Sequence, residues 1–317
     1  MLHLGYIRTQ SHPRFPRYRI ANYTEKAVFD KEWNDVTLQC RGLIFDDNSG
    51  TVIARPFRKF FNHNESTAPK IGLHDPVVVT DKMDGSLGIL YRDPDGYWAV
   101  ATRGSFDSDQ ARHATALFQA RYENYMGASW GFNPPDGITY LFEIVYPENR
   151  IVVDYGQLDD LVLLGAVDNA TGKSITPEVI QKSNNPWPGP VTETFTYSTY
   201  GQALGADPRP GKEGFVVLDL RTDERVKIKY TDYVILHRLV TGLTARRVHE
   251  AMLDGQELDE FISPLPDEFH DWVRGVAGRI ADQVRNARAA VEHQWLQVIA
   301  ACEEQSPETA DPGFPSD

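Results

Sequence analysis

Apolar and polar residues alternate in short runs along the first two thirds of the chain, as expected for half-buried β-strands. The stretch VTLQCRGLIFDDNSGTVIARPFRKFF at 36–61 is the first clear example, and its DDNSG segment predicts a hairpin turn. Further strands are expected within 76–82, 87–92, 97–104, 138–146, 150–155, 158–176, 213–220 and 225–230. With helices at 107–128 and 176–183, this order predicts a predominantly antiparallel α+β domain.

After about residue 230, the hydrophobic period changes to that of a helix. Segments 231–252 and 266–304 predict helices, and the polar, proline-containing end QSPETADPGFPSD predicts disorder. We therefore expect a sheet domain at 1–235, a small all-helical C-terminal domain at 236–304 and a disordered tail at 305–317.

The composition is that of an ordinary globular protein, with 41% apolar and 24% charged residues in 317. The longest apolar runs, such as LVLLGAV at 161–167, are too short to span a bilayer, and the N-terminus lacks the apolar core of a signal peptide. The two cysteines, Cys40 and Cys302, lie far apart, which favours a reduced setting without disulfides. These features predict a cytoplasmic protein that does not enter a membrane.

The net charge of −13 argues against a nucleic-acid partner for the chain as a whole. The charge is uneven, because residues 250–317 hold fifteen acidic residues and four arginines, which leaves −2 for the rest. Residues 1–24 contain four arginines and no acidic residue. This N-terminal part either presents a locally basic face to a polyanion or is simply well solvated, and its composition fits both interpretations.

Charged side chains interrupt the strand pattern at several places. They are Arg41, Lys59, Lys82, Glu143, Glu213, Lys227 and Lys229. Lys227 and Lys229 are two residues apart and share one strand face, which is either an exposed edge or the wall of a binding site. Glu143 stands in the otherwise apolar strand LFEIVY, where it is either a salt-bridged structural acid or a functional carboxylate.

These residues fall in motifs that resemble those of covalent nucleotidyltransferases, and more narrowly those of T4-type, tRNA-repairing RNA ligases. KMDGSL is similar to the K-x-D-G motif that carries the AMP-accepting lysine, here Lys82. CRGLIFD and RPFRKFFNHNE resemble segments upstream of it, and TRGS resembles the next motif, with Arg103 where lysine is usual. LFEIVYPENRIV, EGFVV and KIK resemble the remaining motifs, in the expected order over residues 20–230.

The resemblance implies a role for each matching residue toward ATP and a divalent cation, Mg²⁺ or Mn²⁺. Lys82 would be the nucleophile, and its amine must be neutral to attack, a form that neighbouring cations favour. Lys227, Lys229 and Glu143 complete the implied catalytic set, with Glu143 and Glu213 as metal contacts. The implied nucleotide-binding residues are Arg41 and Lys59 on phosphates, Phe61 on or beneath adenine, Gly85 beside the nucleotide, and Arg103, Glu213, Gly214 and Tyr23.

The implied activity is that of an ATP-dependent RNA ligase, which joins a 5′-phosphate to a 3′-hydroxyl through lysyl-AMP and an adenylated RNA. Its fold would be an antiparallel-sheet nucleotidyltransferase domain of ATP-grasp-like ligase type, followed by the helical domain. The implied partners are RNA ends, those of tRNA among them, and a separate end-healing kinase or phosphatase. The alternatives are a capping-type or DNA-joining nucleotidyltransferase and a catalytically silent RNA-end binder.

Two features have simpler interpretations. TGKS at 171–174 resembles the end of a phosphate-binding P-loop, but the glycine required five residues before Gly172 is Val167, so we expect a hairpin turn there. Phe61 follows another phenylalanine, and packing in the core explains it as well as adenine binding does.

Overall fold

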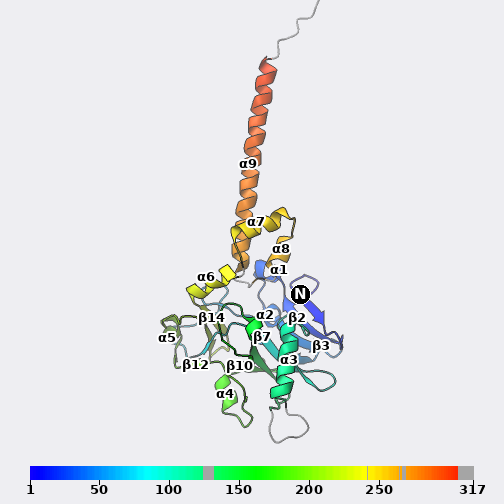
Figure 1. Ribbon diagram of the computed structural model, residues 1–317, viewed down its shortest axis with the longest axis vertical. Coiled ribbons are helices and arrows are strands. Elements are labelled where there is room, and N and C mark those ends of the chain that lie inside the picture. Colours follow the sequence, from blue (N-terminus) through cyan, green and yellow to red (C-terminus); the bar gives the residue numbers. More distant parts are fainter. Residues whose placement is uncertain (124–131, 241, 264, 266–268, 306–317) are drawn as a thin grey trace, which may run out of the picture. The chain divides into compact units, whose positions relative to one another are not determined.

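The computed structural model describes residues 1–317 except 124–131, 241, 264, 266–268 and 306–317 (Figure 1). The chain divides into two compact units, Met1–Gly242 and Leu243–Asp317. The predicted disordered tail at 305–317 lies outside the described residues, apart from its first residue.

The strands described in the first unit form three sheets. One has the order β1 (Ile7–Ser11), β2 (Tyr18–Tyr23), β3 (Arg41–Asp46) and β4 (Val52–Ala54). The second has the order β11 (Ser174–Ile175), β10 (Asp160–Asp168), β9 (Ile138–Val145), β7 (Ser86–Arg92) and β8 (Trp98–Thr102). The third has the order β12 (Thr194–Phe195), β6 (Val77–Asp81), β13 (Gly214–Asp219), β14 (Arg225–Lys229) and β5 (Phe61–Asn62), with β5 parallel to β14. The neighbouring strands are otherwise antiparallel in these sheets, which confirms the predicted α+β class.

Helices connect the strands of the first unit. The short ones are α1 (Glu25–Phe29), α2 (Asp35–Gln39), α4 (Pro177–Gln181), α5 (Tyr200–Leu204) and the 3-10 turn η1 (Pro147–Asn149). The longer α3 (Asp109–Arg121) packs against β8 and β10. It ends earlier than the predicted helix at 107–128, of which 124–128 lie outside the described residues. After β14, α6 (Thr231–Val240) closes the unit.

The largest core lies on the second sheet. Phe142 and Ile144 of β9 and Leu161 and Leu163 of β10 are fully buried, together with Phe118 from α3. Burial on both faces explains why β9 and β10 are nearly continuous apolar runs rather than alternating ones. A glutamate within β9 is therefore conspicuous.

The strand predicted at 150–155 is wrong, because these residues form bends. The backbone amides of Val152 and Val153 donate to Asp84 Oδ2 at 2.9 and 2.8 Å. A side chain thus takes the place of a neighbouring strand, which the apolar pattern of the segment does not reveal.

The second unit contains α7 (Ala245–Leu253), α8 (Leu258–Ile262) and α9 (His270–Gln305). Val248, Ile262 and Val273 are fully buried where these helices meet, whereas Val291 and Trp295 on α9 are exposed. The helical character expected after the sheets is confirmed. None of the described helices is both long enough and apolar enough to cross a membrane.

Gly214 begins β13 in a conformation that requires glycine. Its φ is +149°, and a Cβ on it would lie 1.9 Å from the Ile228 carbonyl oxygen of β14. The paired residue in β14 is Lys229. The close approach of the two strands at this point therefore depends on the missing side chain.

We expect Gly214→Ala to lower the free energy of unfolding by at least roughly 2 kcal/mol, since the methyl group must push β13 away from β14. The matched control is Gly104→Ala, at an exposed position with open space around the added carbon. It should change the free energy by less than about 0.5 kcal/mol. Urea unfolding measures both, and equal stabilities for the two variants would contradict the strand geometry.

Candidate active site

Lys82 stands directly after β6, where the chain leaves the third sheet. Its backbone N–H donates to the Gly214 carbonyl at 3.0 Å, which extends the pairing with β13. Its Nζ lies 2.7 Å from Glu213 Oε1, and Lys229 Nζ lies 2.9 Å from the same oxygen. Because Gly214 and Lys229 are paired, the strand register brings the three charged side chains to one point.

The carboxylate of Glu213 lies deep in this site, with only 2% of its side chain exposed. Its charge is costly there unless it is compensated, and two ammonium groups at Oε1 provide the compensation. Oε2 is also buried and has no hydrogen-bond partner in the part of the chain that the structure describes. Such an acceptor calls for an explanation, and a bound ligand or ion is one. Lys82 retains 20% exposure, so its amine is accessible.

Glu143 approaches the turn after β6 from the second sheet. It is paired with Leu87 across β9 and β7. A Cβ on Gly85 would lie 3.4 Å from Glu143 Oε1 and 2.7 Å from the Ile144 carbonyl oxygen. The turn can lie this close to β9 only because Gly85 has no side chain. This close approach explains the glycine without any contact to a nucleotide.

Burial raises the pKa of the Glu143 carboxyl to about 8. The positive charges of Lys82 and Arg41 oppose this rise in pKa. The carboxylates of Glu213 and Asp84 add to it. A cation bound at this position would favour the ionised carboxylate, so the residue has the properties of a metal or ligand contact.

Asp84 belongs to the KMDG motif but was not among the predicted site residues. Its buried Oδ2 accepts from the amides of Val152 and Val153, and Oδ1 accepts from the Tyr233 hydroxyl of α6 at 2.7 Å. Its own amide donates to the Tyr155 hydroxyl at 2.8 Å. Asp84 thus ties the turn after β6 to two other segments. Asp84 could have been found from the sequence, because it is the aspartate of the KMDG motif. No pattern in the sequence identifies its partner Tyr233.

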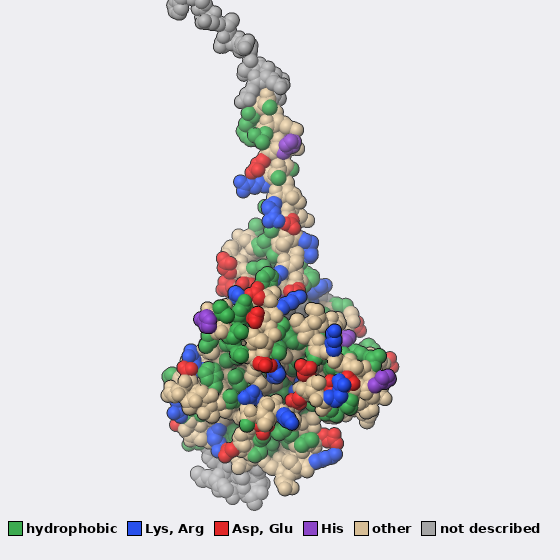
Figure 2. Space-filling view, turned by 180° about the vertical axis from the view of Figure 1, so that it is seen from behind, with side chains coloured by type: hydrophobic (Ala, Val, Ile, Leu, Met, Phe, Trp, Pro, Cys, Tyr) green, Lys and Arg blue, Asp and Glu red, His purple; other side chains and the backbone are tan. Residues whose placement is uncertain are grey.

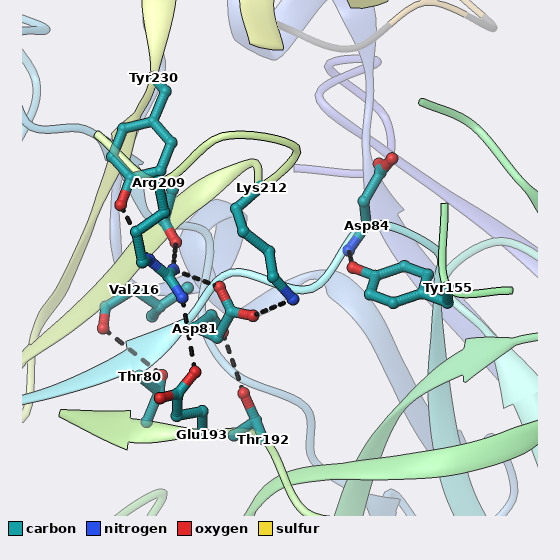
Figure 3. A network of polar contacts seen from close by, with 11 residues as sticks. Thr80, Asp81, Asp84, Tyr155, Thr192, Glu193, Arg209, Lys212, Val216 and Tyr230 are labelled. Carbon is teal, nitrogen blue, oxygen red and sulfur yellow. Dashed lines mark hydrogen bonds and ion pairs between the residues drawn. The ribbon is translucent and has the colours of Figure 1, made fainter. Parts of the chain in front are cut away.

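A second polar network fixes the start of the same turn (Figure 3). The buried Asp81 accepts from Arg209 Nη2 at 2.5 Å, and its other oxygen lies 3.5 Å from Lys212 Nζ. Arg209 also donates to the Gly214 carbonyl and to the Tyr230 hydroxyl, each at 3.1 Å. Arg209 and Lys212 come from the loop between α5 and β13, where charged residues are common, so their positions carry no sequence signal.

Tyr23, Lys59, Phe61 and Arg103 form a separate group. Lys59 Nζ lies 5.4, 5.6 and 5.2 Å from the ring centroids of Tyr23, Trp33 and Phe61. Phe61 is 5% exposed and meets Trp33 edge-on. Arg103 Nη1 donates to the Tyr23 hydroxyl at 3.4 Å. Phe61 is thus part of an aromatic enclosure around a lysine, a packing role in line with the simpler interpretation.

Phe60, which the sequence did not single out, lies close to Arg41, a predicted phosphate-binding residue, and to Lys227 of the predicted catalytic set. Its ring centroid is 5.5 Å from Arg41 Cζ and 5.9 Å from Lys227 Nζ. Successive residues of an extended chain point to opposite sides, so one ring of the FF pair faces these cations and the other faces Trp33. The double phenylalanine was visible in the sequence, but its orientation was not.

The residues present suit a magnesium or manganese ion that also binds phosphate. Within the described residues, no three or more His, Cys, Asp or Glu side chains are grouped to hold a metal. Glu143 and Glu213 would thus supply two carboxylates. Mg²⁺ in nucleotide sites is usually held by one or two carboxylates together with phosphate oxygens and water, so this pair and the unpartnered Glu213 Oε2 fit.

Glu143→Gln is expected to flatten the pH dependence of stability. Because its folded-state pKa near 8 exceeds the value of about 4.3 for an exposed glutamate, the folded wild type binds more protons between these values and loses stability as the pH rises. The free energy of unfolding of the wild type should fall by up to roughly 1.4 kcal/mol per pH unit because of this one group. The variant should not show this fall, because its amide does not titrate.

Urea unfolding of both proteins from about pH 5 to about pH 8, without nucleotide, measures this difference. Stability curves that stay parallel across the range would contradict the raised pKa.

Comparison with known proteins identifies the family of the chain. A family model described as RNA ligase matches residues 39–233, more than half of the chain. An RNA ligase of Rhodothermus phage RM378 is 26% identical over 305 residues, which cover 76% of this chain and 68% of that protein. A putative bifunctional polynucleotide kinase/RNA ligase of Autographa californica nuclear polyhedrosis virus is 26% identical, covering 79% of this chain and 39% of that protein. RNA ligase 1 of bacteriophage TS2126 is 29% identical, covering 57% and 47%.

Among solved structures, a Naegleria gruberi RNA ligase with PPi is similar at 18% identity and a TM-score of 0.38, over 52% of each chain. The family match includes every site residue predicted from Arg41 to Lys229. The chain therefore belongs to the RNA ligase family.

Proposed function

We propose that this protein is an ATP-dependent RNA ligase that joins 5′-phosphate and 3′-hydroxyl RNA ends through a lysyl-AMP intermediate. The observation that carries the proposal is the position of Lys82 Nζ, accessible and 2.7 Å from Glu213, in a turn held by Asp84. Membership of the RNA ligase family supports it.

In the first step, the deprotonated Lys82 Nζ attacks the α-phosphorus of ATP. An N–P bond forms, the bond to the bridging oxygen breaks, and pyrophosphate leaves. Glu213 Oε1 lies at hydrogen-bonding distance from Nζ and is placed to accept the proton that the ammonium releases. Lys229, at the same oxygen, would then face the negative charge of the α-phosphate.

In the second step, an oxygen of the RNA 5′-phosphate attacks the phosphorus of lysyl-AMP. The N–P bond breaks, and the amine leaves and regains a proton. In the third step, the RNA 3′-hydroxyl attacks the phosphorus of the 5′-phosphate, loses its proton, and displaces AMP to form the phosphodiester. ATP is therefore consumed to attach AMP to the 5′-phosphate. The 3′-hydroxyl then displaces AMP, which is a better leaving group than a bare phosphate oxygen.

The surrounding cations would stabilise charge that moves onto the leaving phosphates. Lys227 Nζ and Arg41 Cζ lie 5.9 and 5.5 Å from the Phe60 ring centroid, and Lys59 lies among the rings of Tyr23, Trp33 and Phe61. A bound Mg²⁺ or Mn²⁺ would supply further neutralisation there, with Glu143 and Glu213 as its protein oxygens. Preorganised charges of this kind are usually the largest contribution to phosphoryl transfer.

The biological role we propose is RNA repair in the cytoplasm, with a cleaved tRNA as one candidate substrate. A separate kinase and phosphatase would prepare the required ends. One relative is named as a putative bifunctional polynucleotide kinase/RNA ligase, and this chain covers 39% of it, which supports a partner that heals ends.

Lys82→Ala is expected to abolish formation of the AMP adduct, because it removes the amine of the K-x-D-G motif that we propose as the nucleophile. The measurement is incubation with labelled ATP and Mg²⁺, followed by detection of labelled protein that is acid-labile and alkali-stable. Lys182→Ala, which removes an exposed lysine of a helix end, is the matched control and should form the adduct as the wild type does.

An adduct that persists in Lys82→Ala would overturn the assignment of the nucleophile. GTP in place of ATP tests the capping-type alternative, and DNA ends in place of RNA ends test the DNA-joining alternative. Binding of RNA ends without any adduct in the wild type would identify a silent binder.

A further inference from the structure

A cavity of about 620 Å³ lies in the first unit and shares Lys59 and Phe60 with the candidate active site. Other walls come from the turn between β10 and β11 at 171–174 and from the β13–β14 hairpin at 222–225. The first of these turns is the TGKS sequence, which is not a P-loop but does line this cavity. Of the residues given roles in the reaction above, Lys59 is the one that also lines the cavity.

A row of cations on β14 leads from Lys82 toward this cavity. Arg225, Lys227 and Lys229 alternate along the strand, so they share one face. Lys229 reaches Glu213, Lys227 lies over Phe60, and the Arg225 guanidinium lies 3.8 Å from the ring centroid of Phe57. At about 3.3 Å per residue, the row spans roughly 13 Å.

Arg225 forms no ion pair within the part of the chain that the structure describes, although the charge of Asp223 acts on it. It donates from Nη1 to Ser174 Oγ at 2.7 Å, and no carboxylate forms an ion pair with it among the residues that the structure describes. Burial lowers the pKa of its guanidinium to about 10, whereas the charge of Asp223 opposes this change. An arginine has five N–H donors, so the partly buried Arg225, with the Ser174 hydroxyl as its hydrogen-bond partner, suits an incoming anion.

The acidic residues of the cavity wall are already engaged or point outward. Asp35 pairs with Arg58 at 2.7 Å, and Asp223 accepts from both Ser174 N and Ser174 Oγ at 3.0 Å. The third acidic residue, Glu224, is exposed. The hydrogen bonds from Ser174 leave Asp223 charged beside Arg225. The lining as a whole still has an excess of positive charge, because these three acidic residues face five basic ones: Arg55, Arg58, Lys59, Lys173 and Arg225.

Aromatic rings accompany this charge. Trp33 and Phe60, which are both partly exposed, line the cavity together with the exposed Lys173, whereas the ring of Phe57 is buried against Arg225. Aromatic rings beside cations are the combination that binds single-stranded nucleic acid, because bases stack on rings and phosphates meet positive charges. On the face that Figure 2 shows, basic and acidic side chains are interspersed, so no broad electropositive surface is seen on that face of the first unit.

We propose that this cavity binds a single-stranded segment of the RNA substrate next to the end that reacts at Lys82, with bases on its aromatic rings and a phosphate at Arg225. This assignment rests on the proposed RNA ligase function. The terminal phosphates of ATP share the same chemistry. RNA is favoured because the cavity offers the partly exposed rings of Trp33 and Phe60 as well as Arg225, and a triphosphate alone does not need aromatic rings.

The test uses the full chain and Lys173→Glu, with Lys182→Glu as a control that makes the same charge change at an exposed site on α4. Binding of a fluorescent single-stranded RNA of about 12 nucleotides and formation of the AMP adduct from ATP alone are measured separately. We expect Lys173→Glu to weaken RNA binding about 10-fold with a shallower salt dependence, while the KM for ATP in adduct formation stays within about twofold. Lys182→Glu should bind RNA as the wild type does.

Arg225→Gln provides a second variant, checked for folding by urea unfolding, and should weaken RNA binding further than Lys173→Glu. Unchanged RNA affinity with a raised KM for ATP would assign the cavity to the triphosphate and overturn the proposal. Unchanged values of both in a folded Arg225→Gln would also overturn it. Failure of the wild type to form the adduct would count against the ligase function alone, since the RNA binding measurement does not require ATP.

Discussion

The candidate active site depends on two ion pairs that the buried carboxylate of Glu213 forms with Lys82 and Lys229. The carboxylate draws Lys82 from the end of β6 and Lys229 from the end of β14 to a single oxygen, 2.7 and 2.9 Å away. Removing either lysine would leave a buried charge partly uncompensated, a loss that typically costs several kcal/mol. The same ion network that stabilises the third sheet therefore places the candidate nucleophile, so stability and function depend on one contact.

Two aspartates hold the turn around this contact from opposite ends. Asp81 engages Arg209 and Lys212 before the turn, and Asp84 engages the 152–155 segment and Tyr233 after it. Such fully bonded buried carboxylates restrict the backbone, because each oxygen has a fixed partner. These contacts restrain the backbone on both sides of Lys82, which suits the role we propose for it in holding AMP and then releasing it.

The sequence was sufficient for the sheet-rich class, because strand alternation is a local signal. The KMDG motif drew attention to Lys82, which the structure places beside Glu213, but its role as nucleophile stays a prediction. It did not reveal the partners of Asp84, since the apolar run at 150–155 has the pattern of a strand and only the folded chain shows its amides turned to a carboxylate. Likewise, the FF pair did not show that Phe60 faces Arg41 and Lys227. These contacts join segments far apart in the chain, and periodicity carries no information about them.

The most direct test of the central contact is the single-turnover rate of AMP adduct formation by Glu213→Gln at saturating ATP, with folding verified in the same preparation. The amide keeps the size of the side chain but removes the negative charge that pairs with the two lysines and that, in the mechanism we propose, accepts the proton of the amine. We predict a rate at least about 100-fold below that of the wild type. A folded variant that forms the adduct at the wild-type rate would contradict the account.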